Sequence, residues 1–504
     1  MIATLFVQAA CAQPLSGTYR IGANGDFGSL SKLDGLFAAL NTHGAQGLVT
    51  ALVVSDITGE DGSVALMPMN ATASLLIRPV GAARLISGAS VSELGLIAIV
   101  GADHVELNGA LTASNTDQAR KLTIQNTNPD AAAVVAVLSQ GLDGASDIRL
   151  RNLNILGAGG SVTSGVRIGN GFSLNSWDID DFLIENSSIR QVWRGIFAQL
   201  DDAGINQRWL IQRNVVEDNS GSGIYLRAVE APHVIANVIR NLSTSCCGIA
   251  GIELSFDTVN AKIEGNTVHN IRASDSFEST DGILVYPGRK DSTTVVVNNM
   301  VSGIFGAVSG GEWGSAIRFA GREPGTLKVF HNSINIYPSE NANALAASSF
   351  GIALSSAYQG EVKYNVTRCA LPQDLPAGSN RRCATVLISV PTANNLRFDQ
   401  NLYQFTGAHS FLAAVMTASN SQIATVSSLG SWQSGFNQDL LGRVGDPRFF
   451  TDANLHVRAG SATAQLATGT TTAVDIDGDL RNPALADAGA DEVSSDALIA
   501  DGFE

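Results

Sequence analysis

The sequence is poor in charge, and the charge that it has is mostly acidic. Charged residues are 15% of the 504, with 46 acidic and 31 basic side chains, which gives a net charge of −15. Because nucleic-acid binding needs a basic footprint on the protein, this balance argues against a nucleic-acid partner. No apolar run approaches the roughly 18 residues that a membrane-spanning helix needs, so we expect no membrane span.

Linkers are also lacking. There are only 13 prolines, and no Pro-rich or low-complexity stretch divides a chain that exceeds one ordinary domain in length. The hydrophobic residues, 45% of the total, are spread in short pieces among 51 glycines. This distribution favours one large core that is built in many thin layers, and we expect a monomer.

The first residues suggest export. Residues 1–12, "MIATLFVQAACA", are apolar and close on an A-x-A-like "ACA" before Gln13, as a signal cleavage site does. An uncleaved apolar arm is one alternative, because no basic stretch precedes it. Acylation of Cys11 is a weaker one, because Gln8 stands where an apolar residue is usual. We expect a secreted protein, extracellular or on the cell surface.

The remaining cysteines are even in number, which agrees with an oxidising compartment. Cys369 and Cys383 flank the insert "ALPQDLPAGSNRR", so a disulfide is predicted between them. The adjacent Cys246 and Cys247 are harder to bridge, and we expect two buried thiols there.

Two residue series repeat along the chain. An Asn precedes an apolar pair or a similar short strand at Asn152, Asn186, Asn214, Asn237, Asn266, Asn299, Asn332, Asn365 and Asn401. Short apolar strands follow at 165–169, 195–199, 223–227, 251–255, 282–286, 316–320 and 351–355, most of them opened by Gly. No 3.6-residue pattern accompanies the repeats, which excludes helical arrays. Constant strands with variable gaps predict a coiled stack of parallel strands.

The Asn positions have a physical explanation in such a stack. Each Asn would occupy a left-handed bend, which Asn tolerates, and its amide would bond to the same Asn of the neighbouring coils. The predicted fold is therefore all-β, a single-stranded right-handed parallel β-helix. An amphipathic helix over 31–43 would cap its N-terminal end, with Leu33, Leu36, Phe37 and Leu40 on one face and a Ser31–Asp34 capping box.

The predicted organisation has five parts. Residues 1–12 are the signal segment, 13–95 the cap helix and first coils, 96–450 the β-helix, 451–492 closing coils and 493–504 a tail.

Several stretches resemble a known group of proteins. "GTYRIGANGDFGSLSKLDGLFAALNTHG", "GADHVELNGALT" and the Asn/Gly coils resemble secreted bacterial right-handed β-helix repeat proteins of the pectin-lyase-like superfamily. The closing "LGSWQSGFNQDLLGRVGDPRFF" and "DIDGDLRNPALADAGADE" are similar to the last coils of these proteins. The resemblance covers roughly residues 17–492 and implies the fold, whereas proteins on this fold have many activities.

The enzyme motifs of that superfamily are missing. Polygalacturonase-like hydrolases carry adjacent aspartates, then Gly-His-Gly and Arg-x-Lys, and no His here follows a Gly in that way. The Trp-Ile-Asp-His motif of pectate lyases is also absent; "WDIDDF" at 177–182 departs from it.

Strand alternation predicts an outward row of side chains that could bind sugar. The first column is Arg167, Phe197, Tyr225, Glu253, Leu284, Arg318 and Ala353, and the second contains Gln199, Arg227, Ser255 and Tyr286. The loop "VWRGIFAQLDDAGINQRW" adds Trp193, Arg194, Asp201, Asp202, Arg208 and Trp209, and "YPGR" adds Arg289. Rings and guanidinium groups together suit a polysaccharide or cell-surface glycan. The alternative is a solvated face with structural ion pairs.

Catalysis on this face would need two carboxylates. Glu253 is the only one in the two columns, and Asp202 would be its partner, about 9.6 Å away at two coils of 4.8 Å. Glu253, Asp202 and Arg227 are the predicted catalytic residues; Trp193, Trp209, Tyr225, Tyr286, Arg289 and Arg318 are the predicted substrate-binding residues. Two functions remain open: a protein that binds and cleaves polysaccharide as a lyase or hydrolase, or a non-catalytic adhesin or structural protein.

No cofactor is expected, with calcium as the one alternative. Asp475, Asp477 and Asp479 alternate as calcium ligands often do, but the distal Glu of a calcium loop is not at its place. A structural turn is the favoured interpretation.

Overall fold

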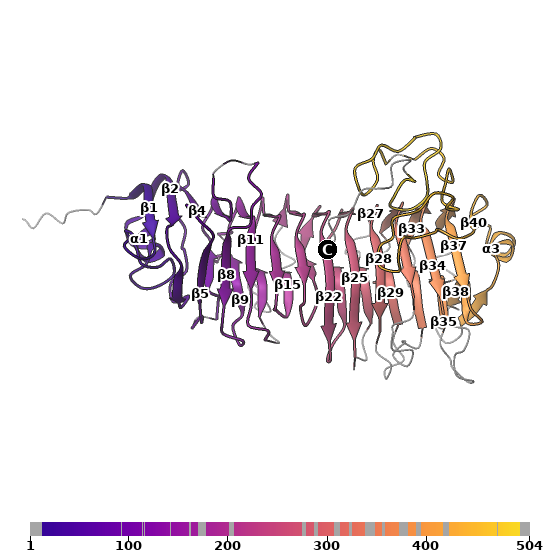
Figure 1. Cartoon of the computed structure of the whole chain (residues 1–504), viewed down its shortest axis with the longest axis horizontal. Coiled ribbons are helices and arrows are strands. Elements are labelled where there is room, and N and C mark those ends of the chain that lie inside the picture. Colours follow the sequence, from indigo (N-terminus) through magenta and orange to yellow (C-terminus); the bar gives the residue numbers. More distant parts are fainter. Residues whose placement is uncertain are drawn as a thin grey trace, which may run out of the picture.

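The backbone forms one long coil of parallel strands (Figure 1). This computed structural model describes residues 13–91, 93–112, 114, 116–141, 143–160, 163–169, 178–200, 206–274, 279–286, 291–306, 313–321, 325–337, 348–354, 358–371, 382–389, 395–416, 423–470 and 472–493. From Ser74 to Met416, each turn of the coil supplies one strand to each of three sheets, always in the same order. The predicted parallel β-helix is confirmed.

Strand bounds in each sheet follow the order of the coils. The first sheet consists of β1 (Leu15–Ile21), β2 (Ala45–Val53), β4 (Ser74–Pro79), β7 (Val105–Asn108), β10 (Ile148–Arg151), β13 (Leu183–Glu185), β17 (Leu210–Gln212), β21 (His233–Ile235), β24 (Lys262–Glu264), β27 (Thr293–Val297), β30 (Thr326–Phe330), β33 (Gln359–Lys363) and β36 (Leu396–Asp399). The second consists of β3 (Ile57–Glu60), β5 (Arg84–Gly88), β8 (Leu122–Asn126), β11 (Leu153–Leu156), β14 (Ser188–Arg190), β18 (Val215–Glu217), β22 (Val238–Thr244), β25 (Thr267–Ala273), β28 (Met300–Phe305), β31 (Ser333–Ile336), β34 (Val366–Ala370), β37 (Leu402–Thr406) and β40 (Arg443–Val444). The third consists of β6 (Ile97–Val100), β9 (Ala133–Leu138), β12 (Ser164–Ile168), β15 (Arg194–Gln199), β19 (Ile224–Arg227), β23 (Ile249–Leu254), β26 (Thr280–Val285), β29 (Trp313–Phe319), β32 (Ser348–Leu354), β35 (Arg382–Ser389), β38 (Ser410–Met416) and β39 (Ile423–Val426). A short extra pair joins β16 (Asn206–Gln207) to β20 (Val229–Glu230).

The interior of the coil is a set of aliphatic stacks. In the first sheet, Ile184, Ile211, Val234, Ile263 and Val296 are paired from coil to coil, and each is fully buried. Burying such a side chain contributes about 1.5–3 kcal/mol. Because every coil repeats the pattern, the short apolar pieces of the sequence add up to one continuous core.

A ladder of buried asparagine side chains runs inside the corner between the first and second sheets. Along Asn214, Asn237, Asn266, Asn299, Asn332, Asn365 and Asn401, each Nδ2 donates to Oδ1 of the next Asn at 2.9–3.1 Å. The same Oδ1 accepts the backbone N–H of the preceding Asn at 2.9–3.0 Å. The second Nδ2 hydrogen donates to a backbone carbonyl, such as that of Val234 for Asn266. These amides are thus buried and fully hydrogen-bonded.

The left-handed residue at this corner is the one before each ladder Asn, so the predicted left-handed conformation is wrong for the seven ladder residues and confirmed only for Asn152 and Asn186. Arg213, Ala236, Gly265, Asn298, His331, Tyr364 and Gln400 have φ between 52° and 62°. Asn152 and Asn186 occupy this preceding position, with φ of 56° and 46°, and lie outside the ladder. Ser187 takes the ladder position, and its N–H donates to Asn214 Oδ1 at 3.0 Å.

The N-terminal helix is shorter than the predicted 31–43. Helix α1 spans Leu36–His43 and lies at the N-terminal end of the coil (Figure 1), burying Leu36, Phe37 and Leu40. Leu33 is 82% exposed, so it does not belong to the buried face. Ser31 makes no capping box either, because its hydroxyl donates to Glu60 Oε2 at 2.6 Å. Gly44 ends the helix with φ 73°, as expected of a C-terminal glycine.

Residues 449–493 form no closing coils, in contrast to the prediction for 451–492. Helix α3 (Leu429–Phe436), which buries Trp432, lies at the C-terminal end of the coil. The chain then doubles back over the outer face of the second sheet, where it forms a raised mass above the last coils (Figure 1). Phe449, Leu455, Val457 and Leu466 pack there against side chains of β28, β34 and β37. We call residues 449–493 the C-terminal cover. No helix in the described parts of the chain is long and apolar enough to cross a bilayer.

Both cysteine pairs are disulfides in the structure. Cys369 is joined to Cys383, with Cα atoms 6.1 Å apart, so the bond spans the predicted insert. Cys246 and Cys247 are also joined. The expectation of two buried thiols there is wrong, because the two cysteines are bonded to each other and neither is buried. Cys246 is exposed and Cys247 is half-buried.

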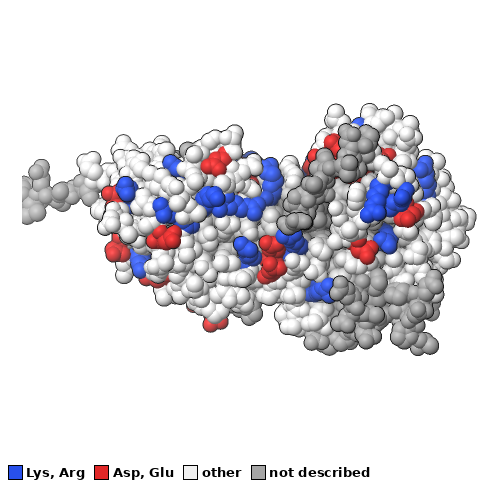
Figure 2. Space-filling view, viewed as in Figure 1, with Lys and Arg blue, Asp and Glu red and all other residues white. Residues whose placement is uncertain are grey.

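Charged side chains on the outer faces pair between coils. Figure 2 shows one face, where Lys and Arg form a band across the coils and Asp and Glu lie beside parts of it. Arg151 and Arg213 both donate to Glu185, at 2.5 and 2.8 Å, and Arg240 donates to Glu217 at 2.8 Å. Pairs at the surface contribute only about 0–1 kcal/mol each. The stability of the coil therefore depends mainly on the interior stacks and the ladder.

The ladder can be tested at its centre. Asn266→Ala removes one amide and leaves the N–H of Asn237 and the side chains on both sides without their partners, so we expect a loss of about 1–3 kcal/mol in unfolding free energy. Denaturant unfolding followed by circular dichroism measures it. The matched control is Asn395→Ala, because Asn395 is exposed. Equal losses in the two variants would contradict a structural role for the ladder.

Candidate functional site

The predicted outward columns lie on the outer face of the third sheet. The strand register pairs Arg167 with Phe197, Phe197 with Tyr225, and Tyr225 with Glu253. Leu284, Arg318 and Ala353 continue the column on the following coils. In the second column, Gln199 pairs with Arg227. The predicted register is therefore confirmed, and the middle of this face carries its aromatic and charged groups.

Arg194, the first residue of β15, lies against three aromatic rings. Its Cζ is 3.9 Å from the ring centroid of Trp193, 4.4 Å from that of Phe197 and 5.3 Å from that of Tyr225. The Phe197 and Tyr225 rings belong to successive coils, and their centroids are 5.2 Å apart. A guanidinium this close to a ring is attracted by the negative charge of its face. We call Trp193, Arg194, Phe197 and Tyr225 the Arg194 cluster.

Glu253 and Arg227 belong to the same electrostatic environment. Glu253 lies beside Tyr225 on the next coil, and Arg227 follows two residues after Tyr225 in β19. Burial lowers the pKa of Arg194, and the charge of Glu253 raises it. Burial raises the pKa of Tyr225; its hydrogen bond with Ser255 lowers it, and Glu253 raises it again. One ligand at this point would meet both guanidinium groups, the carboxylate and the rings.

Asp281 is a buried carboxylate on this sheet that the sequence analysis missed. It pairs with Ala250 in the register, is fully buried, and forms an ion pair with Arg318 at 3.5 Å. Ser279 Oγ donates to its Oδ2 at 2.7 Å. Burial raises the pKa of Asp281 to about 6, although the charge of Arg318 lowers it. The available signal was an acid inside the otherwise apolar strand "TDGILV", directly before a repeat glycine.

A second aromatic pair lies just after the ends of strands β23 and β26 of the third sheet. The ring of Tyr286 stacks on that of Phe256, with centroids 5.1 Å apart and planes 29° apart. Phe256, just after β23, is 54% exposed, and Tyr286, just after β26, is half-buried. The predicted binding role of Tyr286 stays a prediction, and Phe256 is a partner that the sequence analysis did not name.

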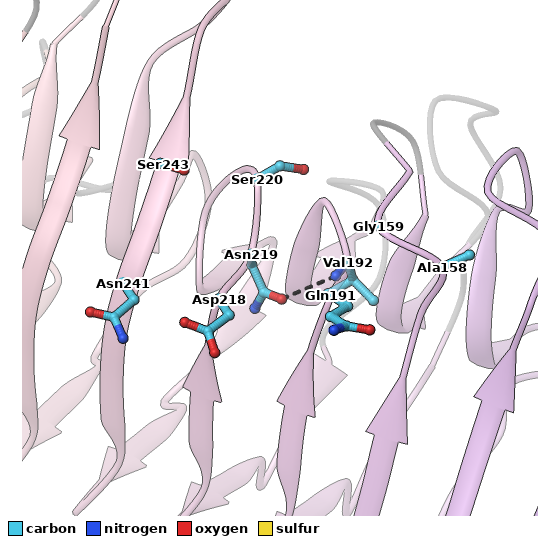
Figure 3. Close-up of a pocket in the computed structure, with 9 residues that line it drawn as sticks. All are labelled: Ala158, Gly159, Gln191, Val192, Asp218, Asn219, Ser220, Asn241 and Ser243. Atoms are coloured by element: carbon cyan, nitrogen blue, oxygen red, sulfur yellow. Dashed lines mark hydrogen bonds between the residues drawn. The ribbon is translucent and has the colours of Figure 1, made fainter.

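A polar groove lies beside the Arg194 cluster, at the corner between the second and third sheets (Figure 3). Its volume is about 570 Å³, and it is lined by Ala158, Gly159, Gln191, Val192, Asp218, Asn219, Ser220, Asn241 and Ser243. In Figure 3 the side chains of Gln191, Asp218 and Asn241 point the same way from successive coils. Asn219 points inward, and its Oδ1 accepts the N–H of Val192 at 3.1 Å.

Trp193 connects the groove to the Arg194 cluster. It directly follows Val192 of the groove wall, and its ring lies against Gly221, where an added Cβ would be 2.6 Å from Trp193 Cδ1. Only a residue without a side chain lets the ring pack against the backbone at this point. Aromatic, cationic and hydrogen-bonding groups are thus continuous from the corner onto the sheet.

The prediction that Trp209 is a stacking platform is wrong. Trp209 is 1% exposed, donates its Nε1–H to Ile179 O at 2.6 Å and packs on Phe182 inside the coil. Arg208 is also occupied, because it forms ion pairs with Asp180 and Asp181 at 2.9 and 2.5 Å. Asp201, Asp202 and Arg289 lie outside the described residues, so their roles stay predictions.

Apolar patches lie on the same face towards both ends of the coil. Ala98, Ala133, Ala136 and Leu138 form one patch on β6 and β9. Phe350, Ala353, Ala384, Leu387, Ala414 and Met416 form the other, on β32, β35 and β38. Within the first predicted column, the charged groups therefore lie between Arg167 on β12 and Arg318 on β29.

The three aspartates of 475–479 do not form one ligand set. Asp475 Oδ1 accepts the N–H groups of Asp477 and Asp479 at 3.0 and 2.8 Å, and its Oδ2 accepts that of Glu492 at 3.0 Å. Asp475 is thus the hydrogen-bonding centre of a turn. Asp479 is exposed, and Asp477 faces His456 instead.

The raised pKa of Asp281 predicts a pH dependence of stability. The folded protein holds a proton on this carboxyl up to about pH 6, whereas the ordinary value is 3.8, so between these values the folded state binds more protons. The unfolding free energy of the native protein should therefore fall, relative to Asp281→Asn, as the pH rises from about 4 to about 6. The change is on the order of 3 kcal/mol.

Denaturant unfolding at pH 4, 5, 6 and 7 measures this difference. Asp130→Asn is the control, since Asp130 is exposed. Parallel pH curves for the native protein and Asp281→Asn would contradict the burial of this carboxyl.

A comparison with protein families agrees with the geometry. A family model described as a right-handed β-helix region matches residues 141–322. No curated protein matches the chain. The same parallel sheets continue on both sides of the matched segment, from β1 to β40. The chain is a right-handed parallel β-helix protein.

Proposed function

We propose that the middle of the third sheet, from β12 to β29, binds an acidic polysaccharide of a cell wall or extracellular matrix. The observation that carries the proposal is the Arg194 cluster beside Glu253 and the polar groove. A guanidinium held over three rings offers charge and flat apolar surface together. Such a polymer lies outside the cell, so the proposal includes an extracellular or cell-surface location.

The repeat of the coil suits a linear polymer. Successive coils are spaced by about 4.8 Å, so outward side chains form straight rows along the axis. Trp193 and Tyr225, both half-buried, supply rings on neighbouring coils, whereas Phe197 is only 6% exposed. Arg194 and Arg227 supply donors beside them. An extended chain of sugars could therefore meet the same kinds of groups repeatedly.

The charge of the face favours an acidic sugar. Arg167, Arg194, Arg227 and Arg318 project from its described strands, against Glu253 and Asp281, although the whole chain carries −15. Arg318 is paired with Asp281. Guanidinium groups bind carboxylates in a planar, bidentate manner, which a uronic acid would satisfy.

Cleavage of the bound polysaccharide would need catalytic groups in addition to the binding surface. Glu253 is positioned beside Tyr225, where it would act as acid or base on a bound sugar, with Arg227 close by. A hydrolase needs a second carboxylate, for which Asp202 remains the prediction. Asp281 is fully buried and paired, so it does not fit that role. A non-catalytic adhesin would share the binding surface and lack only the chemistry.

A polysaccharide panel tests binding. We expect polymers that contain uronic acids, such as polygalacturonate, alginate and hyaluronan, to retard the protein in affinity electrophoresis, and neutral dextran and xylan not to. Arg194→Ala should weaken binding about 10- to 100-fold, because it removes a charge-assisted hydrogen bond to a uronate carboxylate, which contributes about 1.5–3 kcal/mol. Arg272→Ala is the matched control, because Arg272 lies 4.5 Å from the ring of Phe305 on the second sheet. Equal affinity of the native protein and Arg194→Ala would refute this site.

The same panel tests cleavage. Reducing ends report hydrolysis, and the absorbance of unsaturated products reports a lyase. Glu253→Gln keeps the shape of the side chain and removes its charge, so lost turnover with retained binding would support a catalytic Glu253. Binding without turnover by the native protein would favour the adhesin.

A further inference from the structure

Three possible metal ligands converge in the C-terminal cover, which packs on the second sheet and not on the third. One ligand atom each of His456, Asp477 and Asp491 lies within 4.8 Å of the others. They come from three separate stretches: His456 precedes the bridge residue Val457, Asp477 lies in the turn centred on Asp475, and Asp491 is close to the end of the cover. The fold of the cover alone brings them together.

The ring of His456 is oriented as a metal ligand would be. Its Nδ1 is 2.5 Å from Asn454 Oδ1, which also accepts the backbone N–H of His456 at 3.1 Å. Because that oxygen accepts, Nδ1 carries the proton. The other ring nitrogen, Nε2, faces Asp477, with Oδ2 at 3.1 Å. In histidines that bind metals, the ring nitrogen that does not bind the ion usually donates a hydrogen bond that fixes the ring, as Nδ1 does here.

Asp491 supplies the buried carboxylate. It is 6% exposed, and its Oδ2 accepts the N–H of Val457 at 2.7 Å. No described group donates a hydrogen bond to Oδ1. Oδ1 is therefore the oxygen of Asp491 that is available to an ion.

We infer that His456, Asp477 and Asp491 bind a divalent transition-metal ion such as Zn²⁺. An imidazole nitrogen with two carboxylate oxygens suits Zn²⁺ and leaves one position of a tetrahedral site for water. Ca²⁺ prefers six to eight oxygen ligands, and Asp475 is already occupied by three N–H groups. This assignment differs from the calcium alternative of the sequence and shares only Asp477 with it.

The ion would hold three stretches of the cover together. Its ligands join three stretches of a segment that has few strands of its own. The cover is held to the coil by contacts such as Asn298 Nδ2 to Val474 O at 2.8 Å and Ser333 Oγ to the N–H of Ala490 at 2.9 Å. An ion that binds only the folded cover would raise the unfolding free energy of the chain with the logarithm of the ion concentration. The inference does not depend on the proposed function.

Titration calorimetry of the untagged full chain, stripped with a chelator, tests the site with ZnCl₂ and, separately, CaCl₂. We expect one Zn²⁺ per chain, no comparable Ca²⁺ binding, and a higher unfolding temperature with Zn²⁺. Asp477→Asn should weaken Zn²⁺ binding at least 10-fold, and because 47% of the Asp477 side chain is exposed, this variant should fold. His456→Gln should remove binding and the rise in unfolding temperature.

His104→Gln is the control. His104 lies 3.0 Å from Asp147 in an exposed pair that has no third ligand among the described clusters, so its loss should leave the Zn²⁺ affinity unchanged. Absence of Zn²⁺ binding, equal affinity in Asp477→Asn, or tighter binding of Ca²⁺ than of Zn²⁺ would each overturn the inference.

Discussion

A buried amide must find all its hydrogen-bond partners inside the protein, and the Asn ladder meets this requirement only when coils stack in register. Each Oδ1 accepts two hydrogen bonds from the preceding coil, so a coil shifted by one residue would break both. The ladder ends on Asp439, which accepts the backbone N–H and Nδ2 of Asn401 at 3.1 and 2.9 Å. This fixed register at one corner holds the strands of the first and second sheets in line from coil to coil.

That constraint explains how far the sequence could predict the structure. The repeat of Asn and Gly is periodic, and it gave the β-helix and the column from Arg167 to Ala353 correctly. It could not separate the ladder position from the one before it, because Asn occurs at both, as Asn186 and Asn214 show. The C-terminal cover depends on contacts such as Asn335 to Asp452, 117 residues apart, which no local pattern contains.

The errors in the predicted site residues have local structural causes. Strand alternation would turn Ala250 inward, but an added Cβ on Gly251 would be 2.4 Å from Val268 Cγ1, inside the coil. The glycine thus breaks the alternation, and Ala250 and its neighbour Asp281 face outward together with Glu253. The error for Trp209 has a different cause, because it was assigned to the outer face as a loop residue, although it lies two residues before the buried Ile211 and alternation turns it inward.

The burial of Arg194 argues against a third sheet whose outer face is only a solvated surface. Burial lowers its pKa, so the folded protein holds this charge where solvation is poor. Structural arginines of this chain, such as Arg151 and Arg213, donate to a carboxylate instead. The contacts of Arg194 with three rings stabilise the fold by about 0.5–2 kcal/mol, and the position of these groups beside a groove is what favours a ligand. A ligand that brings its own negative charge would complete the arrangement, which is why we favour an acidic polymer over a bare structural surface.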